Sequence, residues 1–252
     1  MKISLNGRLV DIEGAPCTPS GWLIGVGIFE TLRTVNGAAY AVSRHMQRAI
    51  KSASIAHVTL PQIDLVTAAV EELLLAEPFK NGLLRISFDQ SGQWAAVHLP
   101  YDPITTAAKV GVHLQPLISE GETIKSYPYE NRLAILKQAR TLGFDEAIVS
   151  NSKGNICEGA VTNLLLEIDG RWSTPPTSDG VLPGIMRGLI IDYFQVRVAS
   201  VALSRIGEIT GAFMLSSLRI AQPVASIQGR TLAISKAFND EIHAMAVLDW
   251  LG

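Results

Sequence analysis

Four groups of residues in this 252-residue chain could do chemistry if the fold brings them together. Lys125 carries an amine, which can act as a nucleophile or move a proton, and Glu158 carries a carboxylate. Arg48 carries a permanent positive charge. Gly184-Ile-Met186 opens an apolar segment that we expect to be helical, so its backbone N–H groups could face an anion. Each feature alone is common and is more often structural or solvated, so the interpretation depends on their order.

A series of short motifs surrounds these residues. In chain order they are Gly27-Ile-Phe-Glu-Thr-Leu-Arg33, His45-Met-Gln-Arg48, Lys125-Ser-Tyr-Pro-Tyr-Glu-Asn131, Asn155-Ile-Cys-Glu-Gly-Ala-Val-Thr-Asn163 and Leu182-Pro-Gly-Ile-Met-Arg187. This series resembles the class IV aminotransferase family of fold type IV enzymes. That family includes branched-chain aminotransferases, D-amino acid aminotransferases and 4-amino-4-deoxychorismate lyases. The resemblance covers the chain from about Gly27 to Val224 and is most specific between Lys125 and Arg187.

The resemblance implies pyridoxal 5′-phosphate as cofactor, with the protein binding, orienting and tuning it. Lys125 resembles the lysine that links covalently to this cofactor and moves the substrate proton. The alternative for Lys125 is a surface lysine at a linker. Glu158 resembles the carboxylate that pairs with the pyridine nitrogen and keeps it protonated. The alternative for Glu158 is an exposed residue that caps a turn.

The phosphate of the cofactor needs N–H donors and positive charge. The resemblance assigns these roles to the backbone N–H groups of Ile185 and Met186 and to the side chain of Arg48. The family usually has threonine where this chain has Met186, so a hydroxyl contact is lost there. Ser217, in a short turn that also contains Ser216, resembles a further phosphate contact. The alternative for Arg48 is a solvated arginine on a helix.

Two more residues are predicted to lie beside the cofactor. Tyr129 resembles the tyrosine that hydrogen-bonds the 3′ oxygen, although a core tyrosine would fit the sequence nearly as well. Thr31 resembles a threonine that stands beside the cofactor in the lyase branch, where branched-chain aminotransferases more often have glycine. We therefore assign Thr31 a catalytic role next to Lys125.

The predicted reaction is that of 4-amino-4-deoxychorismate lyase, which gives 4-aminobenzoate and pyruvate. The alternative is an amino acid aminotransferase, of the branched-chain rather than the D-amino acid type, because the segment Ser87–Gly92 lacks the arginine that the latter uses for the substrate carboxylate. The lyases also tend to have an arginine there. Arg219 is predicted to bind a substrate carboxylate in its place, and a solvated loop arginine is the alternative. A non-catalytic cofactor-binding homologue is a minor alternative.

The hydrophobic pattern predicts an α+β or α/β chain of two domains. A smaller N-terminal α+β domain is expected over 1–117, a polar linker over 118–124, and a larger cofactor-binding domain over 125–252, with the cofactor at the junction. Asn6-Gly7 and Asn36-Gly37 predict two hairpins. The expected helices are Arg44–Ser54, Ile63–Ala76, Tyr129–Leu142, Gly188–Phe194 and Ser235–Leu251, and the expected strands include Leu83–Phe88, Trp94–Leu99, Lys109–Leu114, Glu146–Ser150, Asn163–Ile168, Trp172–Thr174, Phe213–Ser216 and Pro223–Ile227.

Composition limits the class of protein. The formal net charge is -2, so nothing indicates nucleic acid or an anionic membrane as a partner. No signal-peptide or membrane-helix pattern is found, and no Cys-x-x-Cys or His-Glu-x-x-His box predicts a metal site. The two cysteines, Cys17 and Cys157, are far apart, so a disulfide is possible but not implied, and a reducing cytoplasm is the simpler assumption. The family resemblance further implies a small-molecule substrate and a homodimer.

Overall fold

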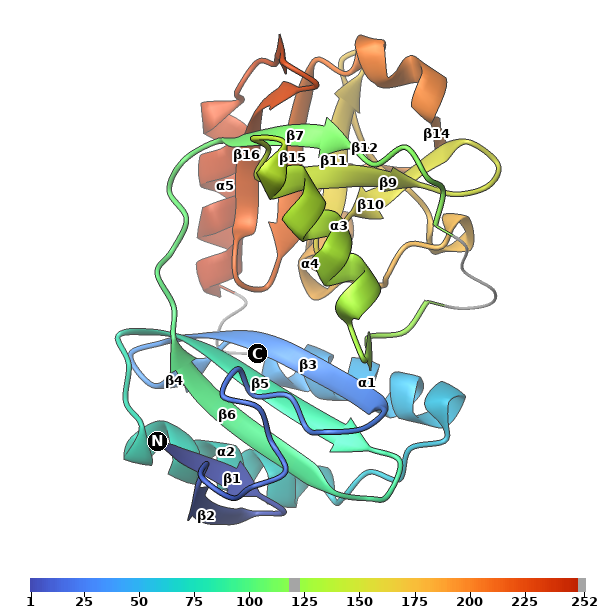
Figure 1. Ribbon diagram of the computed structural model, residues 1–252. Coiled ribbons are helices and arrows are strands. Elements are labelled where there is room, and N and C mark those ends of the chain that lie inside the picture. The colour runs from blue at the N-terminus through green and yellow to red at the C-terminus, as the bar shows by residue number, and fades with distance from the viewer. Residues whose placement is uncertain (118–122, 249–252) are drawn as a thin grey trace. The chain divides into compact units, whose positions relative to one another are not determined.

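The computed structural model describes residues 1–117 and 123–248. These residues form two compact units, each with its own sheet (Figure 1). One unit contains Met1–Pro103 and Ile124–Pro128, and the other contains the remaining described residues. Residues 118–122 of the predicted linker lie outside the described residues. No helix in the described part of the chain is both long and apolar enough to cross a lipid bilayer.

The first unit is built on two hairpins that the turn residues predicted. Strands β1 (Lys2–Leu5) and β2 (Arg8–Asp11) pair antiparallel, and so do β3 (Gly27–Val35) and β4 (Ala38–Ala39). Asn6 and Gly7 have positive φ angles of 51° and 82°, and Asn36 and Gly37 have 49° and 80°. A type I′ turn requires positive φ at both central positions, which explains the Asn-Gly pairs.

The remaining strands of this sheet are β5 (Asn81–Asp89), β6 (Trp94–Pro100) and β8 (Ser126–Tyr127). The order is β2-β1-β6-β5-β3-β4, and β8 pairs with β3. Helices α1 (Val42–Ala56) and α2 (Ile63–Ala76) pack on one face, where alternate side chains of the central strands meet them. This core includes Ile28, Leu32, Met46, Leu73, Leu84, Ile86 and Phe88.

Helix α2 begins and ends where the periodicity predicted, but α1 does not. It begins at Val42, before the predicted start at Arg44, and Ser43 therefore lies in its first turn instead of capping it. The residue at the N-cap position is Ala41, which has a left-handed backbone and makes no side-chain cap hydrogen bond.

The second unit contains a ten-stranded sheet in the described residues, with the order β13-β12-β11-β15-β16-β7-β9-β10-β14 and β17 paired to β16. The expectation that the strand near Lys109 belongs to the N-terminal sheet was wrong. Strand β7 (Ala108–Val112) lies parallel to both β16 and β9 in the second sheet. The other strands are β9 (Glu146–Ser150), β10 (Asn155–Gly159), β11 (Asn163–Ile168), β12 (Arg171–Thr174), β13 (Arg197–Val198), β14 (Val201–Ala202), β15 (Gly211–Ser216), β16 (Ile220–Ile227) and β17 (Arg230–Thr231).

The second sheet must curl strongly. Strands β13 and β14 stand at opposite ends of the strand order, yet Val198 and Val201 are three positions apart in the chain. Three residues span at most about 11 Å, so the two edges of the sheet approach each other. Its interior is apolar and is filled by side chains such as Val110, Ile148, Leu166 and Met214.

The helices of the second unit are α3 (Glu130–Thr141), α4 (Ile185–Tyr193) and α5 (Lys236–Leu248), with short 3-10 turns at Thr177–Asp179 and Leu203–Glu208. Helix α3 packs on β9 through Ile135, Ala139 and Ala147. Gly143, predicted as the residue that stops α3, has a φ of 82° just after the helix. Helix α4 begins three residues before the predicted start, so its first turn is formed by residues Ile185 and Met186.

Candidate active site

In the first unit, Arg48 lies in a buried polar cluster between α1 and β3. Glu30 is 1% exposed and points from β3 toward the helix, between Ile28 and Leu32 of the core. Arg48 donates from Nε to Glu30 Oε1 at 2.9 Å and from a terminal nitrogen to Oε2, and His45 Nδ1 lies 2.7 Å from Oε2. The bidentate contact fixes the guanidinium, so Arg48 is not the solvated helix arginine that the sequence also allowed.

The charged groups in this cluster shift one another's pKa values. Burial acts to raise the pKa of Glu30, but Arg48 and His45 outweigh it and lower the pKa to about 2. Burial lowers the pKa of His45, and the raising effect of Glu30 only partly opposes it. Lys125 also acts to lower the pKa of His45, so its charge is felt in the same cluster.

Lys125 is fixed against β3 by its backbone. The N–H of Phe29 donates to the carbonyl oxygen of Lys125 at 2.9 Å, and the next two residues pair with β3 as β8. The Lys125 Nζ atom lies 4.4 Å from the centre of the Phe29 ring. Thr31 follows Phe29 by two positions on the strand, so both side chains leave β3 on the same face. The Lys125 amine, over the Phe29 ring, and the Thr31 side chain therefore lie on the same face of β3.

Two arginines that the sequence did not indicate share this face. Arg85 on β5 is the direct partner of Thr31, and Arg33 follows Thr31 by two positions on β3. The Arg85 guanidinium lies 4.1 Å from the Trp22 ring centre and donates to the carbonyl of Ser20. Burial lowers its pKa to about 10. The Nε atoms of Arg33 and Arg85 are buried without a hydrogen-bond partner among the described residues.

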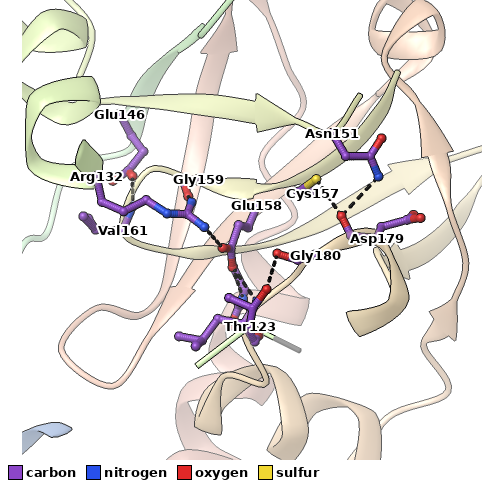
Figure 2. A network of polar contacts seen from close by, with 12 residues as sticks. Thr123, Arg132, Glu146, Asn151, Cys157, Glu158, Gly159, Val161, Asp179 and Gly180 are labelled. Atoms are coloured by element: carbon purple, nitrogen blue, oxygen red, sulfur yellow. Dashed lines mark hydrogen bonds and ion pairs between the residues drawn. The ribbon is translucent and has the colours of Figure 1, made fainter. Parts of the chain in front are cut away.

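In the second unit, Glu158 lies in a polar cluster on β10 (Figure 2). The side chain is 4% exposed, which excludes the exposed turn cap considered from the sequence. Its Oε1 accepts from Arg132 of α3 at 2.6 Å, and its Oε2 accepts from Asn163 Nδ2 at 2.9 Å and from the Leu182 N–H at 3.1 Å. These three donors fix the orientation of the carboxyl group.

A β-bulge sets the direction in which Glu158 points. Ile156 pairs with Ser150 and Glu158 pairs with Val149, so β10 has one extra residue, Cys157, at this position. A bulge of this kind re-aims the side chains that follow it. No sequence pattern predicted the bulge, and β10 itself was not among the predicted strands.

The start of α4 offers N–H donors for an anion. Gly184 is the N-cap residue, and no side chain caps the helix there. A Cβ atom at Gly184 would lie 1.7 Å from Asn163 Oδ1, so only glycine fits beside the amide that also holds Glu158. The side chains of Ile185 and Met186 are buried in the core, 8% and 1% exposed, which leaves only their backbone N–H groups as donors.

Ser217 and Tyr129 are also placed in the second unit. Ser217 is half-buried in the turn between β15 and β16, where the Arg219 N–H donates to Ser216 Oγ at 3.1 Å. Tyr129 is half-buried at the N-cap position of α3, three residues before Arg132. Residues three apart on a helix lie on one side of it.

The geometry does not match the substrate role predicted for Arg219. Its side chain is only 9% exposed, and NH2 forms an ion pair with Glu146 at 2.9 Å. NH1 donates to Gln222 Oε1 at 3.1 Å. The guanidinium is therefore turned into the unit and compensates a buried carboxylate, and it is not a solvated loop arginine either.

A family model described as amino-transferase class IV matches residues 27–227. The chain belongs to the class IV aminotransferase family. A Methanocaldococcus jannaschii protein that bears the name of a branched-chain-amino-acid aminotransferase is 28% identical, over 76% of this chain and 74% of its own. A Mycobacterium tuberculosis protein named bifunctional aminodeoxychorismate lyase / D-amino acid transaminase is 24% identical, over 99% and 100%. The structure of the branched-chain aminotransferase from Thermoproteus uzoniensis with norvaline aligns with a TM-score of 0.88 at 25% identity, over 99% of this chain and 95% of that one.

The fold is therefore that of fold type IV enzymes, and the chain is a pyridoxal-phosphate-dependent enzyme. The residues present fit this cofactor chemically. Glu158 offers a fixed carboxylate for a pyridinium N–H, and the start of α4 and the Ser216–Ser217 turn offer N–H and hydroxyl donors for a phosphate. Lys125 offers an amine for the aldehyde, and Arg48 offers a cation.

The cluster around Glu30 predicts an acid-sensitive contribution to stability. Because its folded-state pKa lies near 2, below the ordinary value of 4.5, the carboxylate stabilises the fold above about pH 4.5. That contribution is lost as the pH falls toward 2. Between neutral pH and pH about 3, we expect the parent to lose on the order of 2 kcal/mol more unfolding free energy than Glu30→Gln. Urea unfolding at a series of pH values measures this difference.

Glu13→Gln is the matched control, since Glu13 is an exposed carboxylate of the same unit. It should follow the parent at every pH. Equal pH dependence in the parent and Glu30→Gln would mean that the pKa of Glu30 is the same in the folded and the unfolded protein, which would contradict the lowered value.

Proposed function

We propose that this enzyme is a 4-amino-4-deoxychorismate lyase that releases pyruvate and 4-aminobenzoate. The observation that carries the proposal is the face of β3 and β5 that presents Thr31 and Lys125 together with Arg33 and Arg85. The substrate has a ring carboxylate and an enolpyruvyl carboxylate. A face with two cations next to a lysine matches a substrate that carries two anionic groups near its reacting amine.

The two arginines need an anion for a physical reason. Arg33 pairs with Leu83 and Arg85 is two residues further along β5, so the two side chains are diagonal neighbours about 7–8 Å apart. Neither forms an ion pair with a described residue. Two like charges on one face of a sheet repel each other, and a bound anion would relieve that repulsion. A planar guanidinium is well suited to bind a carboxylate through two N–H groups.

We assign the proton transfers to Lys125. Bound pyridoxal phosphate supplies an electron-accepting ring for the reaction. The Lys125 amine removes the proton from the ring carbon that bears the substrate amino group. The same nitrogen delivers a proton to the methylene carbon of the leaving group as the C–O bond breaks, which gives pyruvate and leaves an aromatic ring. Thr31, on the same face, orients the groups that react.

We assign the remaining residues to cofactor binding. Glu158 pairs with the pyridine nitrogen, and three donors, from Arg132, Asn163 and the Leu182 N–H, fix the orientation of its side chain for that task. The N–H groups of Ile185 and Met186, the Ser217 hydroxyl and Arg48 bind the phosphate. Tyr129 hydrogen-bonds the 3′ oxygen. We also propose that the enzyme acts in the cytoplasm as a homodimer, as the family resemblance implies.

A branched-chain-type amino acid aminotransferase is the second candidate. The names of the Methanocaldococcus jannaschii relative and of the Thermoproteus uzoniensis structure favour it. The same residues would serve it, because both reactions begin when Lys125 removes a proton from the carbon that bears the amino group. The candidates differ in where the proton is delivered, so a product assay separates them.

Borohydride reduction should fix the cofactor onto a single peptide that contains Lys125. The reason is that the Lys125 amine is the one held at the Phe29 and Thr31 face. Peptide mapping by mass spectrometry identifies the labelled residue, and Lys137→Ala serves as the control because Lys137 is an exposed lysine of α3. Label on Lys137 or Lys153 would refute the role of Lys125.

Incubation of the enzyme with 4-amino-4-deoxychorismate should give 4-aminobenzoate and pyruvate in equal amounts. A panel of branched-chain amino acids with an oxo-acid acceptor, measured in parallel, should show slower turnover. Chromatography of both sets of products makes the comparison. Transamination without 4-aminobenzoate would reject the lyase and retain the aminotransferase.

Arg85→Gln should raise the KM for 4-amino-4-deoxychorismate by about 10- to 100-fold, since a charge-assisted hydrogen bond contributes about 1.5–3 kcal/mol. The cofactor should stay bound, because the proposed cofactor residues do not include Arg85. Arg8→Gln, at an exposed position on β2, is the control and should keep the parental KM. A parental KM in Arg85→Gln would remove Arg85 from the substrate site.

A further inference from the structure

Among the described residues of the second unit, Glu146 is the most buried ionisable residue, and the proposed chemistry does not use it. It is the first residue of β9 and is 0% exposed. Burial raises the pKa of its carboxyl group, and Arg219 opposes that shift. A charge in this position costs stability unless each of its oxygens has a partner. The partners of Glu146 lie in two segments that are far apart in the sequence.

The first partner is the turn that directly follows Glu158. Glu146 Oε1 accepts from the Val161 N–H at 2.8 Å (Figure 2). The turn is tight, since the Gly159 N–H donates to the Thr162 carbonyl at 2.7 Å. A Cβ atom at Gly159 would lie 2.3 Å from Thr162 Oγ1 and 3.0 Å from Glu146 Oε1. Glu146 therefore limits where the chain can run immediately after the residue that meets the pyridine nitrogen.

The second partner is the turn that carries Ser217. Glu146 Oε2 lies 2.9 Å from Arg219 NH2. The Arg219 backbone N–H donates to Ser216 Oγ, and its NH1 donates to Gln222, which in turn donates from Nε2 to the Thr106 carbonyl. Arg219 is thus fixed at its backbone and at its guanidinium, and Glu146 provides the counter-charge.

We propose that Glu146 is a positioning residue that ties the two ends of the cofactor site together. One oxygen holds the segment after Glu158, at the pyridine end, and the other holds Arg219 and through it the Ser216–Ser217 turn, at the phosphate end. The inference rests on the proposed cofactor roles of Glu158 and Ser217. Arg219 acts on the phosphate end alone, whereas Glu146 acts on both ends.

The test compares two cofactor forms on the apoenzyme, prepared from the holoenzyme by removing the cofactor. Pyridoxal 5′-phosphate probes both ends, and pyridoxal, which lacks the phosphate, probes the pyridine end. Arg219→Met should weaken binding of the phosphorylated form by tenfold or more and leave pyridoxal binding within about threefold of the parent. Glu146→Gln should weaken both forms by tenfold or more. Absorbance titration measures each affinity without any turnover.

Arg205→Met is the matched control, because Arg205 pairs with Glu208 and Asp169 on the surface of the same unit. It should leave both affinities at the parental values. If Arg219→Met unfolds, Arg219→Lys, which keeps the charge, should bind both forms and show a smaller loss for the phosphorylated one. Circular dichroism and thermal melting confirm that the compared variants are folded.

Equal weakening of the two forms in Arg219→Met would overturn the proposal, since that result indicates a general loss of structure. Parental affinities in both Arg219→Met and Glu146→Gln would also overturn it. A failure of the proposed cofactor roles looks different, because the parent apoenzyme itself would then bind pyridoxal 5′-phosphate no more tightly than pyridoxal.

Discussion

A carboxylate buried in a protein must be met by a cation or by several N–H donors, and this requirement shapes both units. Glu30, Glu146 and Glu158 are each less than 5% exposed. Each is paired with an arginine from a different element, namely Arg48, Arg219 and Arg132. Breaking such a pair by removing one partner typically costs about 3–5 kcal/mol, so each pair fixes the relative position of the elements that supply it.

The three ion pairs therefore fix the relative positions of elements that hydrophobic packing alone would hold less precisely. Arg48 joins α1 to β3 beside the segment that carries Thr31. Arg132 joins α3 to β10, and Arg219 joins the turn after β15 to β9. Apolar contacts are not directional, so they tolerate small shifts of the packed elements. A carboxylate that accepts hydrogen bonds at both of its oxygens does not tolerate such shifts. The proposed site residues stand on or next to these fixed points.

Sequence patterns predicted the parts of the fold that depend on local rules. The Asn-Gly turns, the helix Ile63–Ala76 and the stop at Gly143 follow from φ preferences and from helical spacing, and the structure confirmed them. The assignment of β7 was wrong because period and propensity identify a strand but not its partners. Strand β7 has a suitable sequence for either sheet.

Candidate site residues could be named from the sequence only where they belong to a recognisable motif. The motif order named Lys125, Glu158 and Arg48, and the buried, hydrogen-bonded positions of the last two agree with specialised roles. Arg85 was missed because its nearness to Thr31 is set by the register of β3 against β5, which no local pattern encodes. The buried ion pair of Arg219 was not predicted for a similar reason, since its partner Glu146 is more than seventy positions earlier in the chain.

The curled second sheet has a consequence for how folded molecules meet in solution. Its edge strands among the described residues, β13, β14 and β17, are each two residues long. An exposed strand edge recruits other chains by offering a row of unpaired N–H and C=O groups, and a row of two residues is too short to template such pairing. We therefore expect this sheet to resist edge-to-edge aggregation even at the high protein concentrations of a crowded cell, and the exposed charge of Arg197 on β13 adds to that resistance.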